Sequence, residues 1–144
     1  MLNTVTTHWK GDLTFKSDNP SGNFVIMDTD VEGKDREGLS PKAMMLSSLA
    51  GCSGLDVISI LDKMKIPLQD FKIEVSGELT DEHPKYYNKV NVTYHFYGEE
   101  LKREKCEKAV ELSVDKYCGV MAMFRRFAEI SIAIKYHASP VSLT

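Results

Sequence analysis

One long apolar segment constrains the fold of this chain more than any other feature. It begins at Ser40 and Pro41, a favourable N-cap followed by a residue that suits the first helical turn. Apolar side chains then recur as far as Met64, and Pro67 ends the segment because proline cannot continue a helix. These side chains lie on most sides of the predicted helix, which is typical of a buried helix rather than a surface one.

A cysteine lies at the centre of this predicted helix. Gly51 and Gly54 flank Cys52, and each glycine destabilises a helix interior by about 1 kcal/mol relative to alanine. A chain usually retains glycine at such a position because another segment approaches closely. We therefore expect Cys52 to lie inside the protein, with a second segment packed against it.

The rest of the chain predicts strands and two further helices. Short alternating segments bounded by turn residues indicate strands, and a stretch rich in Lys and Glu with a regular apolar face indicates an amphipathic helix. Their order is typical of a single α+β domain, 1–144, with antiparallel sheet. One small sheet does not cover so apolar a helix, so we expect an intimate homodimer that buries it from both sides. The predicted strands are 4–9, 13–16, 24–27, 71–76, 90–97 and 130–136, the helices are 40–65, 101–117 and 120–127, and 30–39 is a loop.

Composition and charge disfavour several classes of function. The net charge of −3 and the scattered Lys and Arg residues disfavour a nucleic-acid partner. The N-terminus has no apolar signal segment, and no run reaches the ~18 uninterrupted apolar residues of a membrane span. The four histidines are far apart in the sequence, which disfavours a metal site. We therefore expect a cytoplasmic protein with no membrane insertion and no metal.

Three cysteines, Cys52, Cys106 and Cys118, form neither a disulfide framework nor a C-x-x-C motif. If the fold brings the Cα atoms of Cys52 and Cys118 within ~7 Å, the two can form a reversible disulfide. One thiolate would then attack a peroxide, and the other thiol would capture the resulting sulfenic acid. The alternative is that both pack as small hydrophobic residues, which is the commoner role of a free cysteine. Cys106 lies in a charged stretch, so we expect a half-exposed thiol without a function.

A reactive cysteine must be present as the thiolate, so its pKa must be lowered. A mid-helix position gains little from the helix dipole, which acts within the end turns. A cation must therefore supply the effect, whereas Asp56, one turn after Cys52, would act in the opposite direction. The candidate cations are Lys10, Arg36, Lys42, Arg125 and Arg126.

Several apolar residues are candidates for a substrate pocket beside Cys52. Methionine and phenylalanine at such positions more often belong to the core than to a ligand site. If a pocket is present, flexible methionines suit an apolar substrate. The candidate pocket residues are Met45, Leu49, Met121 and Phe124.

Two segments carry a resemblance to a known family. Ser40-Pro followed by Met-Met-Leu-Ser-Ser-Leu-Ala-Gly-Cys52-Ser, and then Lys116-Tyr-Cys118-Gly-Val, resemble the OsmC/Ohr family of osmotically inducible and organic hydroperoxide resistance proteins. The resemblance implies an α+β fold in which two chains form an interwoven homodimer, with sheets wrapped around two central helices and active sites at the subunit interface. It implies that Cys52 is the peroxidatic thiol and Cys118 the resolving thiol, that organic, often lipid-like hydroperoxides are the substrates, and that a dithiol reductant regenerates the protein without a metal or organic cofactor.

The chain departs from the family pattern at three positions. Lys42 follows the proline of the central helix where the well-studied peroxidases carry a glutamate, and no arginine precedes Arg36 to pair with such an acid. Gly119 follows the second cysteine where proline is common. These differences indicate a divergent subgroup and leave two functions open. One is a cysteine-based peroxidase, and the other is a non-catalytic dimer that senses oxidation or holds an apolar small molecule in the same interface pocket.

Overall fold

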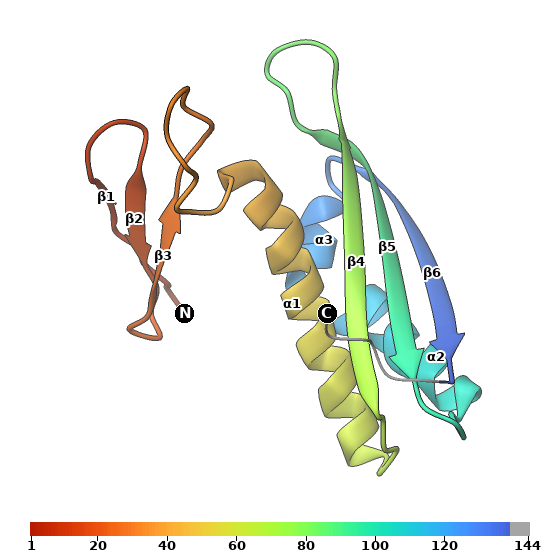
Figure 1. The fold of residues 1–144 in the computed structure, drawn as a ribbon. Coiled ribbons are helices and arrows are strands. Elements are labelled where there is room, and N and C mark those ends of the chain that lie inside the picture. Colours follow the sequence, from red (N-terminus) through yellow and green to blue (C-terminus); the bar gives the residue numbers. More distant parts are fainter. Residues whose placement is uncertain (139–144) are drawn as a thin grey trace. The chain divides into compact units, whose positions relative to one another are not determined.

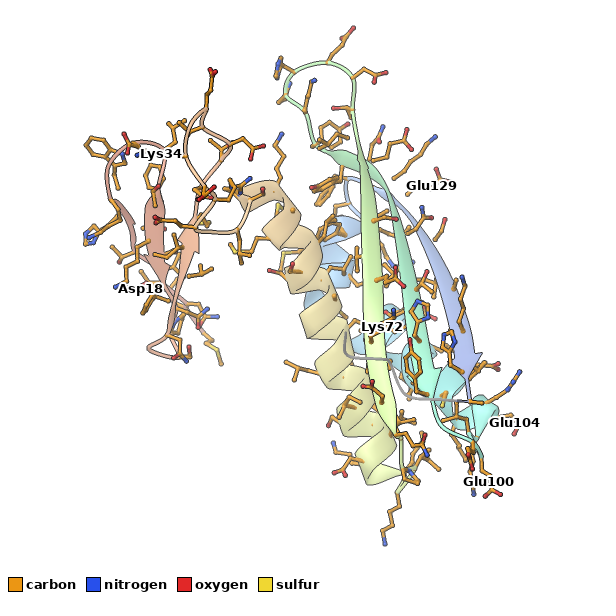
Figure 2. All side chains as sticks on the ribbon, in the orientation of Figure 1. Asp18, Lys34, Lys72, Glu100, Glu104 and Glu129 are labelled. Carbon is orange, nitrogen blue, oxygen red and sulfur yellow. The ribbon has the colours of Figure 1, made fainter. Side chains whose placement is uncertain are left out.

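The computed structural model describes residues 1–138, which form two compact units (Figure 1). The first unit is Met1–Met45 and the second begins at Leu46. Charged side chains are spread over the surface of each unit (Figure 2), for example Asp18 and Lys34 on the first, and Lys72, Glu104 and Glu129 on the second.

The first unit contains a three-stranded antiparallel sheet. Its strands are β1 (Thr7–Trp9), β2 (Phe15–Asp18) and β3 (Phe24–Met27), in the order β1-β2-β3. Gly11 and Gly22 take positive φ angles of 100° and 88° in the two hairpin turns, a conformation that glycine adopts without strain. The predicted antiparallel meander is therefore present.

The second unit contains a mixed sheet with the strand order β4-β5-β6. The strands β4 (Asp70–Leu79) and β5 (Tyr87–Tyr97) pair antiparallel, as predicted. In contrast, β6 (Glu129–His137) pairs with β5 in the parallel direction. The helices between β5 and β6 provide the long crossover that a parallel pair requires, because a hairpin cannot join parallel strands.

Four helical elements accompany this sheet. The central helix is α1 (Pro41–Lys63), and α2 (Arg103–Leu112), η1 (Ser113–Tyr117) and α3 (Gly119–Phe124) follow β5. The element η1 is a turn of π-helix, so the predicted helix over 101–117 continues with a wider last turn. Cys118 has an extended backbone between η1 and α3, with φ −75° and ψ 103°.

The core of the second unit lies on one face of its sheet. Alternate residues of β5, including Tyr94 and Phe96, are fully buried against α1 and the helices of the crossover. The buried stripe of α1 repeats every fourth residue, as one face of a helix does. The members of this stripe are Leu49, Ser53, Val57 and Leu61.

Within the second unit α1 is covered on one side only, whereas the sequence predicts burial all round. Leu55 is 76% exposed and Ile58 is 45% exposed, although both are strongly apolar. Gly54 has a close neighbour in Ile73, whose Cδ1 lies 3.1 Å from the place of an added Cβ, while Gly51 faces open space. The predicted close approach is therefore present at Gly54, and the far side of α1 is open within the described part of the second unit.

By length and composition, α1 would suffice to cross a membrane, with 23 residues and a mean hydropathy of 1.6. Its buried stripe instead packs against the sheet of the second unit, as in the core helix of a globular domain.

The prediction for Cys106 is wrong. This residue is fully buried in the core, together with Ala109 and Val110 on the same face of α2. The charged neighbours that suggested exposure occupy the other faces of the helix, since adjacent residues on a helix point in different directions.

Candidate active site

The structure brings Cys52 and Cys118 together. Cys52 is half-buried on α1 and packs against the core, and Cys118 is buried between η1 and α3. Both thiols are free, and Cys52 is a close enough neighbour of Cys118 to raise the pKa of the Cys118 thiol. Neighbouring thiols can form a reversible disulfide when their Cβ atoms take disulfide geometry.

The environment of Cys118 favours the neutral thiol. Burial, together with the neighbouring Cys52 and the Asp56 carboxylate, raises the pKa of Cys118 to about 11. The Met121 N–H acts in the opposite direction by donating to Cys118 Sγ at 3.3 Å. At neutral pH Cys118 therefore carries its proton.

The π-helix η1 sets the position of Cys118. The Cys118 N–H donates to the Ser113 carbonyl at 2.8 Å, which is the i to i−5 bond that closes a π-turn. Single π-turns of this kind are frequent at functional sites. Because Cys118 also caps α3 through its sulfur, both its main chain and its side chain are fixed.

A chain of buried polar groups connects α1, β5 and η1 next to the cysteines. Ser53 Oγ lies 2.6 Å from the Tyr94 hydroxyl and 2.8 Å from Ser113 Oγ. Ser113 Oγ also lies 3.0 Å from Asp56 Oδ2, to which it donates. Sequence reasoning missed Ser53, Tyr94 and Ser113. A polar residue within the otherwise apolar stripe of α1 was the available signal for Ser53.

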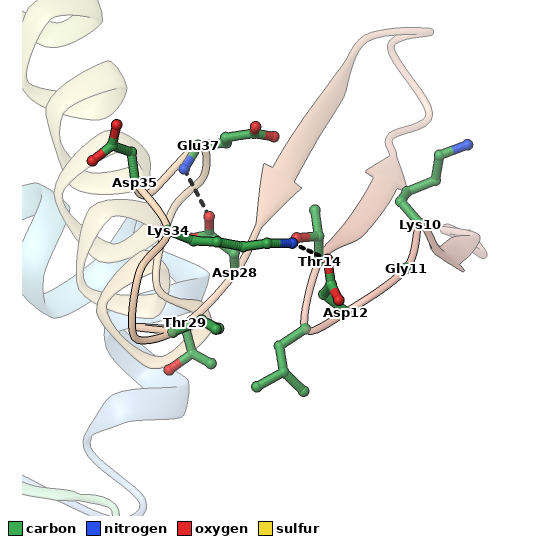
Figure 3. A pocket seen from close by; sticks show the side chains of 11 residues that line it. Lys10, Gly11, Asp12, Thr14, Asp28, Thr29, Lys34, Asp35 and Glu37 are labelled. Atoms are coloured by element: carbon green, nitrogen blue, oxygen red, sulfur yellow. Dashed lines mark hydrogen bonds and ion pairs between the residues drawn. The ribbon is translucent and has the colours of Figure 1, made fainter.

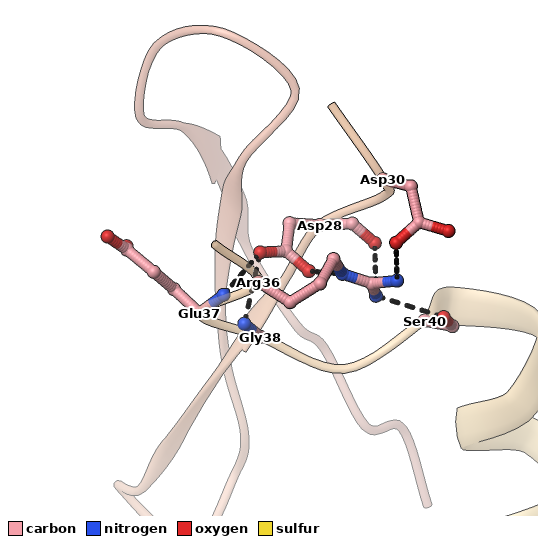
Figure 4. Close-up of polar contacts among 6 residues, drawn as sticks. All are labelled: Asp28, Asp30, Arg36, Glu37, Gly38 and Ser40. Carbon is pink, nitrogen blue, oxygen red and sulfur yellow. Dashed lines mark hydrogen bonds and ion pairs between the residues drawn. The ribbon is translucent and has the colours of Figure 1, made fainter. Parts of the chain in front are cut away.

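Arg36 is fully engaged within the first unit (Figure 4). Its guanidinium donates to Asp28 Oδ1 at 2.6 Å, to Asp30 at 3.1 Å and to Ser40 Oγ at 3.0 Å. The backbone N–H of Glu37 and the Arg36 guanidinium lower the pKa of Asp28. Arg36 therefore links the loop after β3 to Ser40, the residue that precedes α1.

The other candidate cations have separate surroundings. Lys10 is exposed and lines a cavity of about 230 Å³ in the first unit, where its side chain points away from the Lys34–Asp12 ion pair (Figure 3). Lys42 is exposed in the first turn of α1, about 15 Å along the helix axis from Cys52 by the rise per residue. Arg125 pairs with Asp115 at 3.4 Å, and Arg126 is exposed. The charged group that acts on Cys118 from α1 is an anion, Asp56.

The candidate pocket residues are mostly core residues. Leu49, Met121 and Phe124 are at most 1% exposed, so they offer no open surface to a ligand in this conformation. This placement differs from the expected open pocket, because all three belong to the hydrophobic core of the second unit. Met45 is 46% exposed at the start of α1.

Two other hollows lie along α1. A cleft of about 380 Å³ contains Asp56 and Tyr117, which are close neighbours of the two cysteines in the sequence. Its remaining walls are Ser59, Ile60, Lys63, Met64 and Leu112. A shallow apolar groove of about 580 Å³ lies between α1 and the edge strand β4, and its members are Ala50, Gly51, Gly54, Leu55, Ile58, Phe71, Lys72 and Ile73.

Two histidines that are distant in the sequence meet on the outer face of the second sheet. His95 Nδ1 lies 2.9 Å from His137 Nε2, and His95 Nε2 lies 2.7 Å from Glu74 Oε1. The parallel pairing of β5 with β6, which the sequence did not indicate, produces this contact. Within residues 1–138, no group of three or more His, Cys, Asp or Glu side chains is arranged to hold a metal ion.

Comparison with known proteins places this arrangement in a family. Residues 33–133 match the family of OsmC-like proteins. The chain belongs to this family. The OsmC-like chain is 32% identical to Protein YhfA of Escherichia coli K12 over 123 residues, which are 85% of this chain and 90% of YhfA.

Solved structures share its fold. A hypothetical protein from Aquifex aeolicus superposes with a TM-score of 0.83 at 29% identity, covering 94% of this chain and 96% of that one. The organic hydroperoxide resistance protein OhrB of Bacillus subtilis superposes with a TM-score of 0.62 at 18% identity, covering 94% and 98%. The OsmC-like fold, an α+β fold with a central helix, is thus shared with proteins named for hydroperoxide resistance.

Proposed function

We propose that this OsmC-like protein is a thiol-dependent peroxidase that reduces organic hydroperoxides. The observation that supports it best is that two free thiols of unequal burial, Cys52 and Cys118, are close neighbours. The half-buried Cys52 is the accessible partner, and the buried Cys118 retains its proton. Proteins named for organic hydroperoxide resistance share the fold, which supports the substrate class.

The reaction has three balanced steps. The Cys52 thiolate attacks the terminal oxygen of the hydroperoxide, the O–O bond breaks, and Cys52 becomes a sulfenic acid. The alkoxide leaves and takes up a proton from water to become the alcohol. Cys118 sulfur then bonds to Cys52 sulfur, and the hydroxyl of the sulfenic acid leaves as water with the Cys118 proton. A dithiol reductant finally exchanges with the disulfide and restores both thiols.

The proposed assembly is a homodimer formed through the open side of α1. Leu55 and Ile58 are exposed apolar residues on this side, and the adjacent groove is lined almost entirely by apolar and small residues. Gly51 faces open space, so a second helix can approach α1 closely there. Burying such a surface is favourable at about 25 cal/mol per Å² of apolar area.

The experiment is a steady-state assay with cumene hydroperoxide, hydrogen peroxide and dithiothreitol. Cys52→Ser abolishes turnover, and Cys118→Ser allows the sulfenic acid to form but prevents the disulfide. Cys106→Ala is the matched control, because this thiol is buried in the core outside the pair. Wild-type consumption of the organic hydroperoxide by Cys52→Ser would refute the proposed function.

A second candidate is a redox sensor or carrier of an apolar small molecule. The observation in its favour is the engagement of Arg36 with Asp28 and Asp30, which leaves that cation committed within the first unit. This alternative predicts that peroxide oxidises the protein once without catalytic turnover in the presence of dithiothreitol. Native mass spectrometry with a retained lipid-like molecule would support the carrier.

A further inference from the structure

Four polar groups, one of them the half-buried Asp56, form a hydrogen-bonded chain. Ser113 Oγ donates to Asp56 Oδ2 at 3.0 Å, and the Ser53 carbonyl is a second acceptor for the same hydroxyl at 3.3 Å. Ser113 Oγ also lies 2.8 Å from Ser53 Oγ, which in turn lies 2.6 Å from the Tyr94 hydroxyl. Tyr94, Ser53 and Ser113 are fully buried, so water does not compete for these bonds.

This chain connects the segments that carry the two cysteines. Ser53 follows Cys52 directly on α1, and Asp56 lies one turn later on the same helix. Ser113 is the first residue of η1, and its carbonyl accepts the N–H of Cys118 at 2.8 Å. Ser113 therefore holds the Cys52 turn through its side chain and Cys118 through its main chain.

We propose that Ser113 and Asp56 are positioning residues that hold Cys118 in line with Cys52 for disulfide formation. The proposal rests on the proposed function for the source of the sulfenic acid, but the alignment itself applies to any oxidation of the pair. Displacement of a reacting atom by about 1 Å can slow a reaction about 100-fold. A hydrogen-bonded chain that fixes both cysteines therefore affects the formation of the disulfide rather than the formation of the sulfenic acid.

The charge of Asp56 predicts a pH dependence of disulfide formation that a purely structural role would not produce. The titratable groups that face Cys118 are Cys52 and Asp56 from α1 and Tyr94 from β5. The Asp56 carboxylate raises the pKa of Cys118, after burial and Cys52. Loss of this charge makes the Cys118 proton easier to remove, so disulfide formation then accelerates at a lower pH.

The test uses full-length Ser113→Ala and Asp56→Asn, with Ser131→Ala on the exposed face of β6 as the matched control. After one equivalent of cumene hydroperoxide, dimedone traps the Cys52 sulfenic acid, and mass spectrometry follows its conversion to the Cys52–Cys118 disulfide between pH 6 and 10. We expect Ser113→Ala to form the disulfide about tenfold more slowly, or slower still, and to accumulate trapped sulfenic acid. We expect Asp56→Asn, which keeps an acceptor for Ser113, to shift the pH profile of disulfide formation to lower pH.

A second oxidant separates this proposal from the peroxidase itself. Oxidised glutathione forms a mixed disulfide with Cys52, releasing reduced glutathione, and Cys118 then displaces the second glutathione, so no peroxide is needed. In one outcome the wild-type protein forms no sulfenic acid, while Ser113→Ala slows the exchange with oxidised glutathione and Asp56→Asn shifts its pH profile. This result would reject the peroxidase function and support the positioning role. Wild-type rates and an unshifted pH profile in Asp56→Asn would overturn the positioning role, even if Ser113→Ala does not fold.

Discussion

The burial of Cys118 predicts a specific loss of stability at alkaline pH. The pKa of Cys118 is about 11 in the folded chain, against 9.0 for a free thiol. Well below pH 9 the thiol is neutral in the folded and the unfolded state, so its full contribution to the free energy of unfolding is present there. As the pH rises above 9, the unfolded state loses the proton first and is favoured, until the folded thiol ionises near pH 11.

The magnitude follows from the difference in pKa. One pKa unit corresponds to 1.36 kcal/mol, so the rise from 9.0 to about 11 removes about 2 kcal/mol from the free energy of unfolding between pH 8 and 11, and the remainder is lost above pH 11. Burial is the largest cause of the shift. Most of the effect should therefore persist in Cys52→Ala, which removes the neighbouring thiol only.

The assay is urea unfolding of the wild type and of Cys118→Ala at half-unit steps of pH, at one protein concentration and with a phosphine reductant. Cys118→Ala removes packing at every pH, which gives a constant offset, so the difference between the two proteins isolates the ionisation. We expect this difference to shrink by about 2–3 kcal/mol from pH 8 to pH 11. A difference that stays constant over this range would refute the reasoning.

Three further predictions concern other parts of the chain. Burial lowers the pKa of His95, so the unfolded state takes up a proton first as the pH falls through about 6.5, and the folded state loses stability. His95→Gln should therefore reduce the pH dependence of the free energy of unfolding, measured by urea unfolding between pH 7.5 and 5. Asp28→Asn should lower the melting temperature more than Asp30→Asn, because Asp28 is buried and also accepts the Glu37 and Gly38 N–H groups; equal melting temperatures would contradict this. Leu55→Lys on the open side of α1 should yield a monomer in light scattering if the proposed dimer uses that side, whereas Glu99→Lys, an exposed change elsewhere, should not.

The sequence predicts features that depend on local pattern and misses those that depend on contacts between distant segments. The N-cap and first-turn proline locate the start of α1 at Pro41, and alternation locates every strand to within a few residues. The parallel direction of β6 is not encoded in β6 itself, because alternation is the same in both directions. Cys106 was misjudged for a related reason, since its charged neighbours occupy different faces of α2 from the buried one.

The candidate site divides in the same way. Cys52 and Cys118 can be found from the sequence by their chemistry and by family resemblance. The π-turn at Ser113–Tyr117 that places Cys118 has no distinctive composition. The partners of Ser53 lie on β5 and η1, so only the folded chain identifies the polar network.

The two thiols differ in burial, and this difference bears on the search for a cation that would favour a thiolate. A cation favours a thiolate by charge, but a neutral hydrogen-bond donor also favours the charged form of the group it contacts. Cys118 holds its proton because it is buried and faces Asp56. The anion near the pair thus acts on Cys118 and helps to keep this thiol neutral.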